Sequence, residues 1–228
     1  MNTVSVVIPA FNEAERLPTT LAALHGLPGL SEVIVVDDGS TDDTAEAARR
    51  AGARVVRLAQ NRGKGAALQA GTAAARGDVL LLLDADVGET AGEARKLLEP
   101  VLRGEADLVI GAFPRQEGPS GFGLAERAAR WWLRRLTGRE LTSPLSGQRA
   151  LTRQVLEAVG GFAAGFGAEA ALTVDAVRAG FRVLEVPVAM RHRKTGRTVR
   201  GFWHRARQLL HVARALAPRR RQGAARTP

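Results

Sequence analysis

The chain has 228 residues, of which 45% are hydrophobic and none is cysteine. This length and apolar content are enough for one large domain with a full core, and the lack of cysteine excludes disulfides and thiolate chemistry. No apolar run reaches the roughly 20 residues that cross a bilayer, and the first residues enter a strand without a signal peptide. We therefore expect a cytoplasmic protein.

The formal net charge of +10 is concentrated at one end of the chain. Residues 191–228 hold 12 of the 33 Lys and Arg and none of the 23 Asp and Glu, which leaves 21 basic and 23 acidic residues, a net charge of −2, in residues 1–190. Such a basic end suits an anionic partner, whether phosphates, lipid head groups or nucleic acid. A solvated, arginine-rich end without a partner is the alternative.

Strand-like and helix-like segments alternate from the first residues to about residue 113. Runs rich in Val, Ile and Leu predict strands at Thr3–Ile8, Glu32–Val36, Arg54–Leu58, Val79–Leu83 and Asp107–Ala112. Apolar residues at helical spacing lie between these runs. Alternation with short connections predicts right-handed crossovers, and hence an α/β fold with a mainly parallel central sheet and flanking helices.

The pattern changes after residue 113. Residues 114–123 are rich in Gly and Pro and predict a loop, and an apolar stripe at helical spacing follows them. The stripe consists of Leu124, Ala128, Trp131 and Trp132. We expect it to pack on the core, although two adjacent Trp cannot both face inward. A second loop is expected over 138–147, a helix over 168–179, and a strand over 182–190 that Pro187 favours at the edge of the sheet.

Two carboxylates, Asp84 and Asp86, directly follow the unbroken apolar run Val79–Leu83. This run predicts a fully buried parallel strand, and open α/β sheets bind ligands at the carboxyl ends of such strands. Residues i and i+2 of an extended chain point the same way, so both carboxylates can bind one Mg²⁺ or Mn²⁺ and leave positions open for a diphosphate. Equally, one Asp could cap the next helix while the other is merely solvated.

Three other predicted strand ends carry polar groups that would meet at the same edge of the sheet. Pro9–Glu13 is a polar turn without glycine, which argues against a dinucleotide fingerprint or a Walker loop. The carboxylates of Asp37 and Asp38 can accept hydrogen bonds from a base and a ribose. Asn61–Gly65 opens a helix and includes Lys64, so its cation and amides suit a phosphate, although a simple glycine-rich turn explains the same residues.

Taken in order, these segments resemble the family 2 glycosyltransferases. The resemblance covers residues 3 to about 113 and is carried by Val6–Glu13, Val35–Asp42, Asn61–Gly65 and Asp84–Asp86. It implies a GT-A fold and an inverting, metal-dependent transfer from a nucleotide-sugar donor, with UDP-glucose as the expected donor and Mg²⁺ or Mn²⁺ as the metal. A GT-A domain would then span 1–198, with 1–113 as the half that binds the nucleotide sugar and 114–198 as the acceptor half.

The resemblance implies a role for each matched residue. The donor would be bound by Pro9, Ala10, Asn12, Glu13, Asp37, Asp38, Lys64, Asp84 and Ala85. Asp38, with or without Asp37, would recognise a uracil edge, and Lys64 would lie near the diphosphate. Asp84 and Asp86 would face the ribose and the metal, with Asp86 as the more direct metal ligand. The metal and Lys64 would stabilise the charge that develops on the leaving nucleoside diphosphate.

Parts of the second half are similar in order to the acceptor side of glucosyl-3-phosphoglycerate synthases: Pro144–Arg149, Gly165–Glu169, Asp175 and Arg191–Arg193. Polyprenyl-phosphate glycosyltransferases related to dolichyl-phosphate mannose synthase share a comparable Ser-Gly-Xaa-Arg element. The acceptor would therefore be phosphoglycerate-like or a polyprenyl phosphate, and the residues implied to meet it are Ser146, Gly147, Gln148 and Arg149. His192 would complete the metal site. A surface histidine between two arginines is the alternative.

Glu169, with Asp175 as the second candidate, is placed to take a proton from an acceptor hydroxyl. A phosphate acceptor would need no such base, because its second pKa is about 6 and the nucleophile is already ionised. The acceptor thus decides whether Glu169 is catalytic or only orients. The alternative is a first-turn glutamate that stabilises the helix dipole.

Residues 199–217 place apolar and basic side chains on opposite sides at helical spacing, with Phe202 and Trp203 on the apolar side. Such a helix can lie on the inner face of a membrane, or pack on the body of the protein or on the second subunit of a homodimer. Residues 218–228 are expected to be disordered.

Two other functions are compatible with parts of the sequence. A sugar-phosphate nucleotidyltransferase would share the architecture, but it would need a glycine-rich basic loop after the first strand, and residues 9–16 contain no glycine. A non-catalytic protein that binds anionic membranes or nucleic acid would account for the basic end. However, the cations avoid the body and no recognised nucleic-acid motif occurs, so we expect no nucleic-acid partner.

Overall fold

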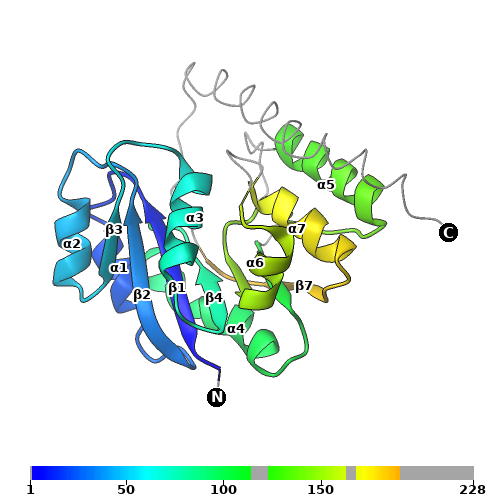
Figure 1. The fold of residues 1–228 in the computed structure, drawn as a ribbon, viewed down its shortest axis with the longest axis horizontal. Helices are drawn as coiled ribbons and strands as arrows, with labels where there is room; N and C mark the ends of the chain where they lie inside the picture. Colours follow the sequence, from blue (N-terminus) through cyan, green and yellow to red (C-terminus); the bar gives the residue numbers. More distant parts are fainter. Residues whose placement is uncertain (1, 114–122, 163–167, 191–228) are drawn as a thin grey trace.

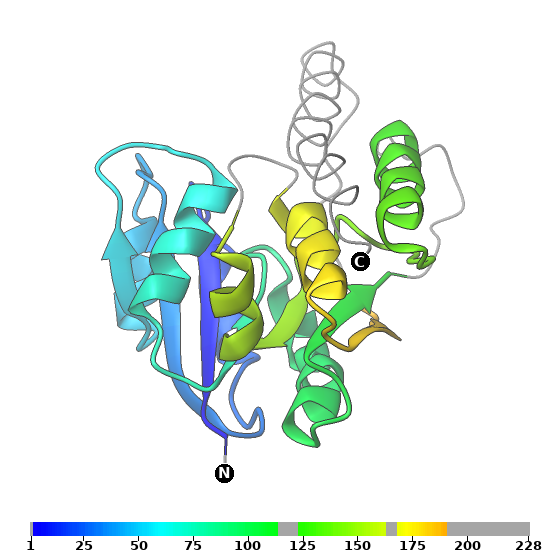
Figure 2. The same cartoon turned by 45° about the vertical axis from the view of Figure 1, so that its right-hand side comes forward.

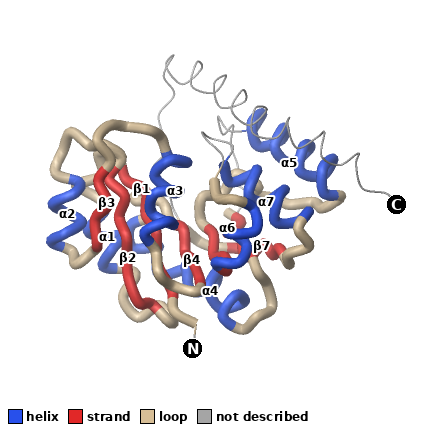
Figure 3. Tube along the Cα trace, viewed as in Figure 1, coloured by secondary structure: helices blue, strands red, loops and turns tan. Residues whose placement is uncertain are grey.

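A computed structural model describes residues 2–113, 123–162 and 168–190 of the chain. These residues form a seven-stranded sheet in the order β3-β2-β1-β4-β6-β5-β7, with helices on both faces (Figure 1, Figure 3). The strands are β1 (Val4–Ala10), β2 (Leu30–Asp37), β3 (Arg54–Arg57), β4 (Val79–Leu82), β5 (Leu108–Ala112), β6 (Arg149–Thr152) and β7 (Val183–Pro187). The helices are α1 (Leu17–Ala22), α2 (Thr44–Arg50), α3 (Lys64–Ala74), the 3₁₀ helix η1 (Gly88–Ala94), α4 (Arg95–Leu102), α5 (Gly123–Thr137), α6 (Arg153–Val159) and α7 (Ala168–Arg178).

The sheet is mainly parallel, as the alternating pattern predicts. Strands β3, β2, β1 and β4 run parallel to their neighbours, and β7 runs parallel to β5. Strand β6 is the exception, because it is antiparallel to both β4 and β5. The sequence patterns predict neither β6 nor the helix α6 that follows it. Four residues are too few to show a period.

Strand β7 lies at the edge of the sheet, which confirms the place that Pro187 favours. A proline has no backbone N–H to donate to a neighbouring strand, so an edge position costs no hydrogen bond of the sheet. Strands from both predicted halves of the chain belong to the same sheet, since β6 lies between β4 and β5.

Apolar side chains of the strands alternate between two cores, one on each face of the sheet. Val6 and Leu81 belong to the core under α1, η1 and α4, whereas Val7, Leu80 and Leu82 belong to the core under α3, α6 and α7. Figure 1 shows α3, α6 and α7 on the near side of the sheet. Because both faces are covered, β4 is buried along its whole length and its sequence is continuously apolar.

Helix α5 lies outside these layers and packs on α7 (Figure 2). Its residues Ala129 and Leu133 are buried against Ala170 of α7. Trp131 lies on the other side of the helix and is 59% exposed, with its ring edge-on to that of Trp132. The predicted helix is confirmed, while Trp131 is not a core residue.

No helix in the described part of the chain is long and apolar enough to cross a membrane. The predicted basic helix over 199–217, the tail 218–228 and the candidate ligand His192 lie outside the described residues.

Gly71 marks a close approach of α3 to the sheet. A Cβ on Gly71 would overlap Val7 Cγ1 and lie 2.7 Å from Val36 Cγ2. We expect Gly71→Ala to lower the free energy of unfolding by about 1–3 kcal/mol, because the added methyl group forces the helix away from β1 and β2. Urea unfolding followed by circular dichroism measures the change.

Gly92→Ala in η1 is the matched control. A Cβ on Gly92 would make an ordinary contact of 3.5 Å with the carbonyl oxygen of Ala23, so we expect a change within about 0.5 kcal/mol. Equal unfolding free energies for the Gly71→Ala variant and the wild type would contradict the close packing of α3 on the sheet.

Candidate active site

The segments after β1, β2, β3 and β4 and the segment before β6 meet at one edge of the sheet. The four parallel strands end at this edge, and the antiparallel β6 begins there, with Arg149 opposite Leu82 of β4. The edge therefore gathers Asp84 after β4, Lys64 at the start of α3, and the residues just before β6. Carboxyl ends of parallel strands are where open α/β sheets bind ligands.

A cavity of about 210 Å³ opens at this edge. Its lining consists of Pro9, Ala10, Phe11, Asp38, Asn61, Gly63, Lys64, Ala67 and Asp84. Five of the predicted donor residues are therefore brought together: Pro9, Ala10, Asp38, Lys64 and Asp84. The other four, Asn12, Glu13, Asp37 and Ala85, do not line the cavity.

Four cavity residues were not among the predicted site residues: Phe11, Asn61, Gly63 and Ala67. Their position in the sequence was the available signal, because Phe11 lies inside the polar turn after β1 and Asn61 and Gly63 lie inside the segment that opens α3. Phe11 is 43% exposed, so its ring is accessible at the wall of the cavity.

Lys64 links the two halves of the chain. Its ammonium nitrogen lies 2.6 Å from Asp84 Oδ1 and 3.0 Å from Glu169 Oε1, and Glu169 comes from the first turn of α7. Burial works against the charged form of Lys64, but the two carboxylates outweigh it, so the pKa of Lys64 lies above its usual value. Lys64 is therefore a cation throughout the neutral range.

Gly147 and Gln148 complete the surroundings of Asp84. A Cβ on Gly147 would overlap Lys64 Nζ and lie 2.9 Å from Asp84 Oδ1, so only glycine allows this approach without a shift. Gln148 donates from Nε2 to Asp84 Oδ2 at 3.1 Å. With Lys64 on one oxygen and Gln148 on the other, the Asp84 carboxylate is held in one orientation.

Asp86 does not continue the strand direction. Ala85 and Asp86 lie in a turn, and Thr20 Oγ1 donates to the carbonyl oxygen of Ala85 at 2.8 Å. The expectation of an extended chain through Asp84 and Asp86 is therefore wrong, because the buried strand ends before them. Among residues 2–113, 123–162 and 168–190, no group of three or more His, Asp or Glu side chains is arranged to hold a metal.

Asp37 and Asp38 have different surroundings. Asp38 lines the cavity and accepts hydrogen bonds from the backbone N–H groups of Arg62 and Gly63, both at 2.8 Å. Asp37 is completely buried, and its Oδ1 accepts the backbone N–H of Ser40 at 2.9 Å. Asp38 is thus the member of the pair that can face a ligand, and it also orders the segment before α3.

The segment after β1 is tied to the segment after β2. The backbone N–H of Asn12 donates to Ser40 Oγ at 3.0 Å, and Asn12 Oδ1 accepts the N–H of Thr41 at 2.9 Å. The N–H of Glu13 donates to Thr44 Oγ1 at 2.9 Å. Asn12 has a φ of 56°, a left-handed conformation that asparagine tolerates better than most residues. Asn12 and Glu13 therefore shape the wall of the cavity.

Arg149 is fully buried and ties the loop before β6 to α7. Its Nε and Nη2 donate to the carbonyl oxygens of Ser146 and Pro144 at 2.7 and 2.8 Å. Its Nη1 donates to the carbonyl oxygen of Glu169 at 2.8 Å and to Thr173 Oγ1 at 2.7 Å. Burial lowers the pKa of Arg149 to about 10. These four bonds use four of the five N–H groups of a fully buried guanidinium, so Arg149 serves mainly to hold the loop to α7.

The remaining predicted residues differ in their distance from Lys64. Asp175 lies on α7 six residues after Glu169, which is about 9 Å further along the helix axis. Ser146 is buried, and its Oγ accepts the N–H of Gln148 at 3.3 Å. Ser146 and Arg149 thus shape the loop, while Gly147 and Gln148 meet Asp84.

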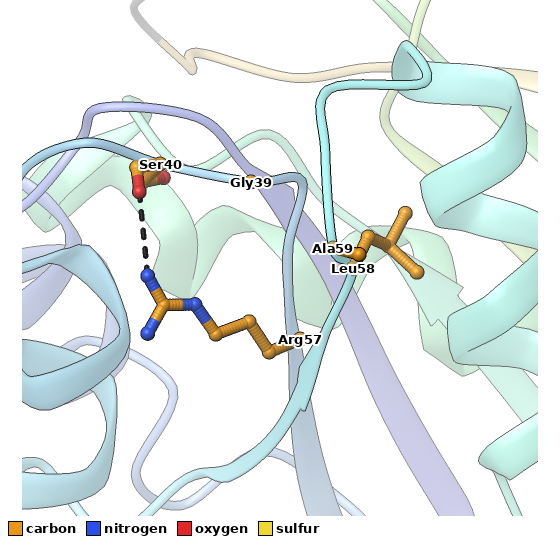
Figure 4. Close-up of a pocket in the computed structure, with 5 residues that line it drawn as sticks. All are labelled: Gly39, Ser40, Arg57, Leu58 and Ala59. Carbon is orange, nitrogen blue, oxygen red and sulfur yellow. Dashed lines mark hydrogen bonds between the residues drawn. The ribbon is translucent and has the colours of Figure 1, made fainter.

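A larger hollow of about 370 Å³ lies at the ends of β2 and β3 (Figure 4). Its lining consists of Gly39, Ser40, Arg57, Leu58 and Ala59. Arg57 Nη2 donates to the carbonyl oxygen of Ser40 at 3.4 Å, and its Nε lies 3.1 Å from Asp37 Oδ2. The charge of Arg57 is thus engaged by the protein. Neither Lys64, Asp84 nor Glu169 lines this hollow, so we assign the chemistry to the smaller cavity.

Comparisons with known proteins point to the same chemistry. Residues 5–166 match the family model Glycosyl transferase family 2. An uncharacterized glycosyltransferase of Mycobacterium tuberculosis is 35% identical over 197 residues, which cover 86% of this chain and 88% of that protein. The undecaprenyl-phosphate mannosyltransferase of Micrococcus luteus is 34% identical over 209 residues, which cover 85% of each protein.

A solved structure adds the likeness of the fold. The glucosyl-3-phosphoglycerate synthase of Mycobacterium tuberculosis, in complex with Mn²⁺, UDP-glucose and phosphoglyceric acid, aligns with a TM-score of 0.78. The alignment has 30% sequence identity and covers 95% of this chain and 80% of that one.

The mixed sheet, the acidic site at its edge and the likeness to this synthase define a glycosyltransferase of the GT-A fold. The family match extends over more than half of the residues, and the chain belongs to glycosyl transferase family 2. This membership decides against the two alternatives, a sugar-phosphate nucleotidyltransferase and a non-catalytic binding protein.

Arg149→Lys is expected to lower the free energy of unfolding by about 2–4 kcal/mol. A single ammonium cannot reach the carbonyl oxygens of Ser146, Pro144 and Glu169 together, so buried acceptors are left unpaired. Thermal and urea unfolding measure the loss. Arg50→Lys, at an exposed position of α2, is the matched control and should change stability by less than about 0.5 kcal/mol. Equal effects of the two substitutions would contradict the structural role of Arg149.

Proposed function

We propose that this enzyme is a metal-dependent glycosyltransferase that moves a sugar, expected to be glucose, from a UDP-sugar donor to a phosphate-bearing acceptor. The observation that carries the proposal is the Lys64 ammonium between Asp84 and Glu169 at the wall of the cavity. A candidate metal ligand, Asp84, and a candidate base, Glu169, thus each lie within hydrogen-bond distance of the same cation.

The cavity suits the nucleotide part of the donor. Asp38 offers a carboxylate to a base, and Phe11 offers an exposed ring on which a base can stack. Asn61 and Gly63 lead into the N-terminus of α3, where backbone N–H groups and the helix dipole favour a phosphate. Structural relatives that hold UDP or UDP-glucose support this assignment.

The carboxylates of Asp84 and Asp86 fit a hard divalent cation, because Mg²⁺ and Mn²⁺ prefer oxygen ligands. Gly147 has no side chain that could cover the Asp84 oxygens. A bound cation would neutralise part of the diphosphate charge. Structures of glucosyl-3-phosphoglycerate synthase that hold Mn²⁺ or Mg²⁺ support the choice of metal, and His192 stays a predicted further ligand.

Lys64 would stabilise the leaving UDP. Negative charge grows on the diphosphate as the glycosidic bond breaks, and a cation that already lies beside it lowers the barrier without reorganisation. The raised pKa of Lys64 keeps this cation protonated. Lys64 could exchange its bond with Asp84 for one with a phosphate oxygen, because its side chain is 36% exposed.

Two acceptor classes remain, and they differ in the attacking atom. Structural relatives bind phosphoglyceric acid or glycerol 3-phosphate, which offer a hydroxyl, whereas the mannosyltransferase relative is named for undecaprenyl phosphate, which offers a phosphate oxygen. Glu169 is nearly buried beside Lys64, on the acceptor half, and can serve as the base for a hydroxyl. The family resemblance implies inversion at the anomeric carbon, which the anomeric proton coupling of the product would show by NMR.

A polyprenyl acceptor would require contact with a lipid surface. The basic segment 199–217 is the predicted contact, and its alternative is packing in a homodimer. Both proposals concern residues outside the described part of the chain.

Asp84→Asn and Asp86→Asn should each weaken Mn²⁺-dependent binding of UDP-glucose at least about tenfold and slow transfer at least about 100-fold, because a neutral amide is a poor ligand for a hard cation. Isothermal titration calorimetry and product analysis measure the two quantities. Asp43→Asn is the control, since Asp43 is exposed before α2 and makes no side-chain capping bond. Transfer at the wild-type rate by both site variants would refute the proposal, as would a wild type that neither binds nor hydrolyses any UDP-sugar.

Glu169→Gln separates the two acceptor classes. With phosphoglycerate as acceptor, the loss of a base should lower kcat about 10²- to 10⁴-fold. With undecaprenyl phosphate the loss should stay below about tenfold, because the attacking oxygen is already ionised. Asp175→Asn is the companion variant. A larger loss of kcat in Asp175→Asn than in Glu169→Gln would transfer the role of base to Asp175.

A further inference from the structure

Gln148 is a buried amide at the point where the two halves of the site meet. Its side chain is completely buried, and its position is fixed through the backbone. The N–H of Gly111 in β5 donates to the carbonyl oxygen of Gln148 at 2.8 Å, and the N–H of Gln148 donates to Ser146 Oγ at 3.3 Å. The backbone of Gln148 therefore connects the ends of β5 and β6, and the residue does not lie on a loop without contacts.

The orientation of the Gln148 amide follows from its partner. Nε2 lies 3.1 Å from Asp84 Oδ2, and an ionised carboxylate can only accept hydrogen bonds. The NH₂ group of Gln148 must therefore face Asp84, which fixes the assignment of oxygen and nitrogen that is otherwise ambiguous in glutamine. Consequently, Oε1 points away from Asp84.

Oε1 is an acceptor with no donor. It is buried, and no hydrogen-bond donor among the described residues satisfies it. Most buried polar side-chain atoms in proteins are paired, so an unpaired one calls for a ligand or an enclosed water molecule as its partner. Its partner must be a donor, such as a hydroxyl group, because a carbonyl oxygen can only accept.

The position of Gln148 relative to Asp84 indicates which part of a donor it would meet. Asp84 Oδ1 faces Lys64, which lines the nucleotide cavity, whereas Oδ2 faces Gln148, which does not line it. Gln148 thus lies on the side of Asp84 that belongs to β5, β6 and the acceptor half. A sugar attached to a diphosphate at Lys64 would meet Gln148 if it extends past Asp84 toward this side.

We propose that Gln148 determines sugar specificity: its Nε2 holds Asp84 in place, and its Oε1 accepts a hydrogen bond from one hydroxyl of the transferred sugar. This inference rests on the proposed function, since it assumes a UDP-hexose at Lys64. A sugar that lacks the hydroxyl would leave Oε1 unpaired in a buried site. Such a site discriminates more strongly than an apolar pocket does.

The test combines one variant with a set of donors. Gln148→Met keeps the length of the side chain and removes both polar atoms. Wild type and variant are assayed with UDP-glucose and with analogues that lack each sugar hydroxyl in turn. For one analogue, kcat/KM of the wild type should fall roughly 10- to 100-fold relative to UDP-glucose. With UDP-glucose, kcat/KM of the Gln148→Met variant should already be lower than that of the wild type by a similar factor. Changing from UDP-glucose to the same analogue should not lower kcat/KM of the variant further.

Two further variants keep the test decisive. Gln154→Met, at an exposed position of α6, should leave the donor profile of the wild type unchanged. Gln148→Glu keeps acceptor oxygens but places a carboxylate against Asp84, so it should retain selectivity for the same hydroxyl while its affinity for UDP-glucose falls at least about tenfold. Gln148→Glu also replaces Gln148→Met as the test variant if Gln148→Met proves unstable in thermal unfolding.

Opposite outcomes overturn the inference. If Gln148→Met and the wild type discriminate equally among the analogues, Oε1 binds no sugar hydroxyl, and an enclosed water molecule is its partner. If Gln148→Glu binds UDP-glucose as the wild type does, Gln148 does not position Asp84. A wild type that uses no UDP-sugar would instead refute the proposed function, so the two failures are distinct.

Discussion

The Lys64 ammonium lies between two carboxylates that come from opposite halves of the chain, Asp84 after β4 and Glu169 in α7. No single element could build this arrangement, since the segment after β4, helix α3 and helix α7 each supply one group. Without the cation, two carboxylates would share a site from which water is largely excluded at Glu169, which is only 5% exposed. Charges in such surroundings are costly unless they are paired. The two ion pairs of Lys64 therefore have two effects. They hold the two halves of the chain together at the sheet edge, and they keep a positive charge where the chemistry needs one.

A second layer of hydrogen bonds holds these groups in place. Asp38 orders the backbone before Lys64, and Arg149 ties the loop that carries Gly147 to the backbone of Glu169. Several polar residues of the matched segments thus form their hydrogen bonds within the protein. Supporting partners of this kind keep reactive groups within a narrow range of positions, which is what pre-organised catalysis requires.

Much of the structure of residues 1–113 could be predicted from the sequence, because buried parallel strands have continuous apolar runs and their ends carry the polar groups. The strands before Asp84 and the placement of Lys64 and Asp38 in one cavity follow from this pattern. The rest depends on tertiary context. Strand β6 is too short to show a period, and the burial of Arg149 contradicts the usual exposure of arginine. The turn at Asp86 is a local backbone choice that residue spacing does not reveal.

The place of β6 in the sheet has a consequence for how the chain acquires its structure. Strands β1 to β4 find their parallel partners within the first 82 residues, so this part of the sheet can form while the remainder is still being synthesised. Strand β5 has no such opportunity, because its neighbours β6 and β7 both come later in the chain. Until residues 149–152 arrive, the outer side of β4 and both sides of β5 lack partners. Such unpaired strands are prone to mispairing. If strands β1 to β4 assemble before then, the apolar edge of β4 stays unpaired until the segment that completes the sheet is synthesised.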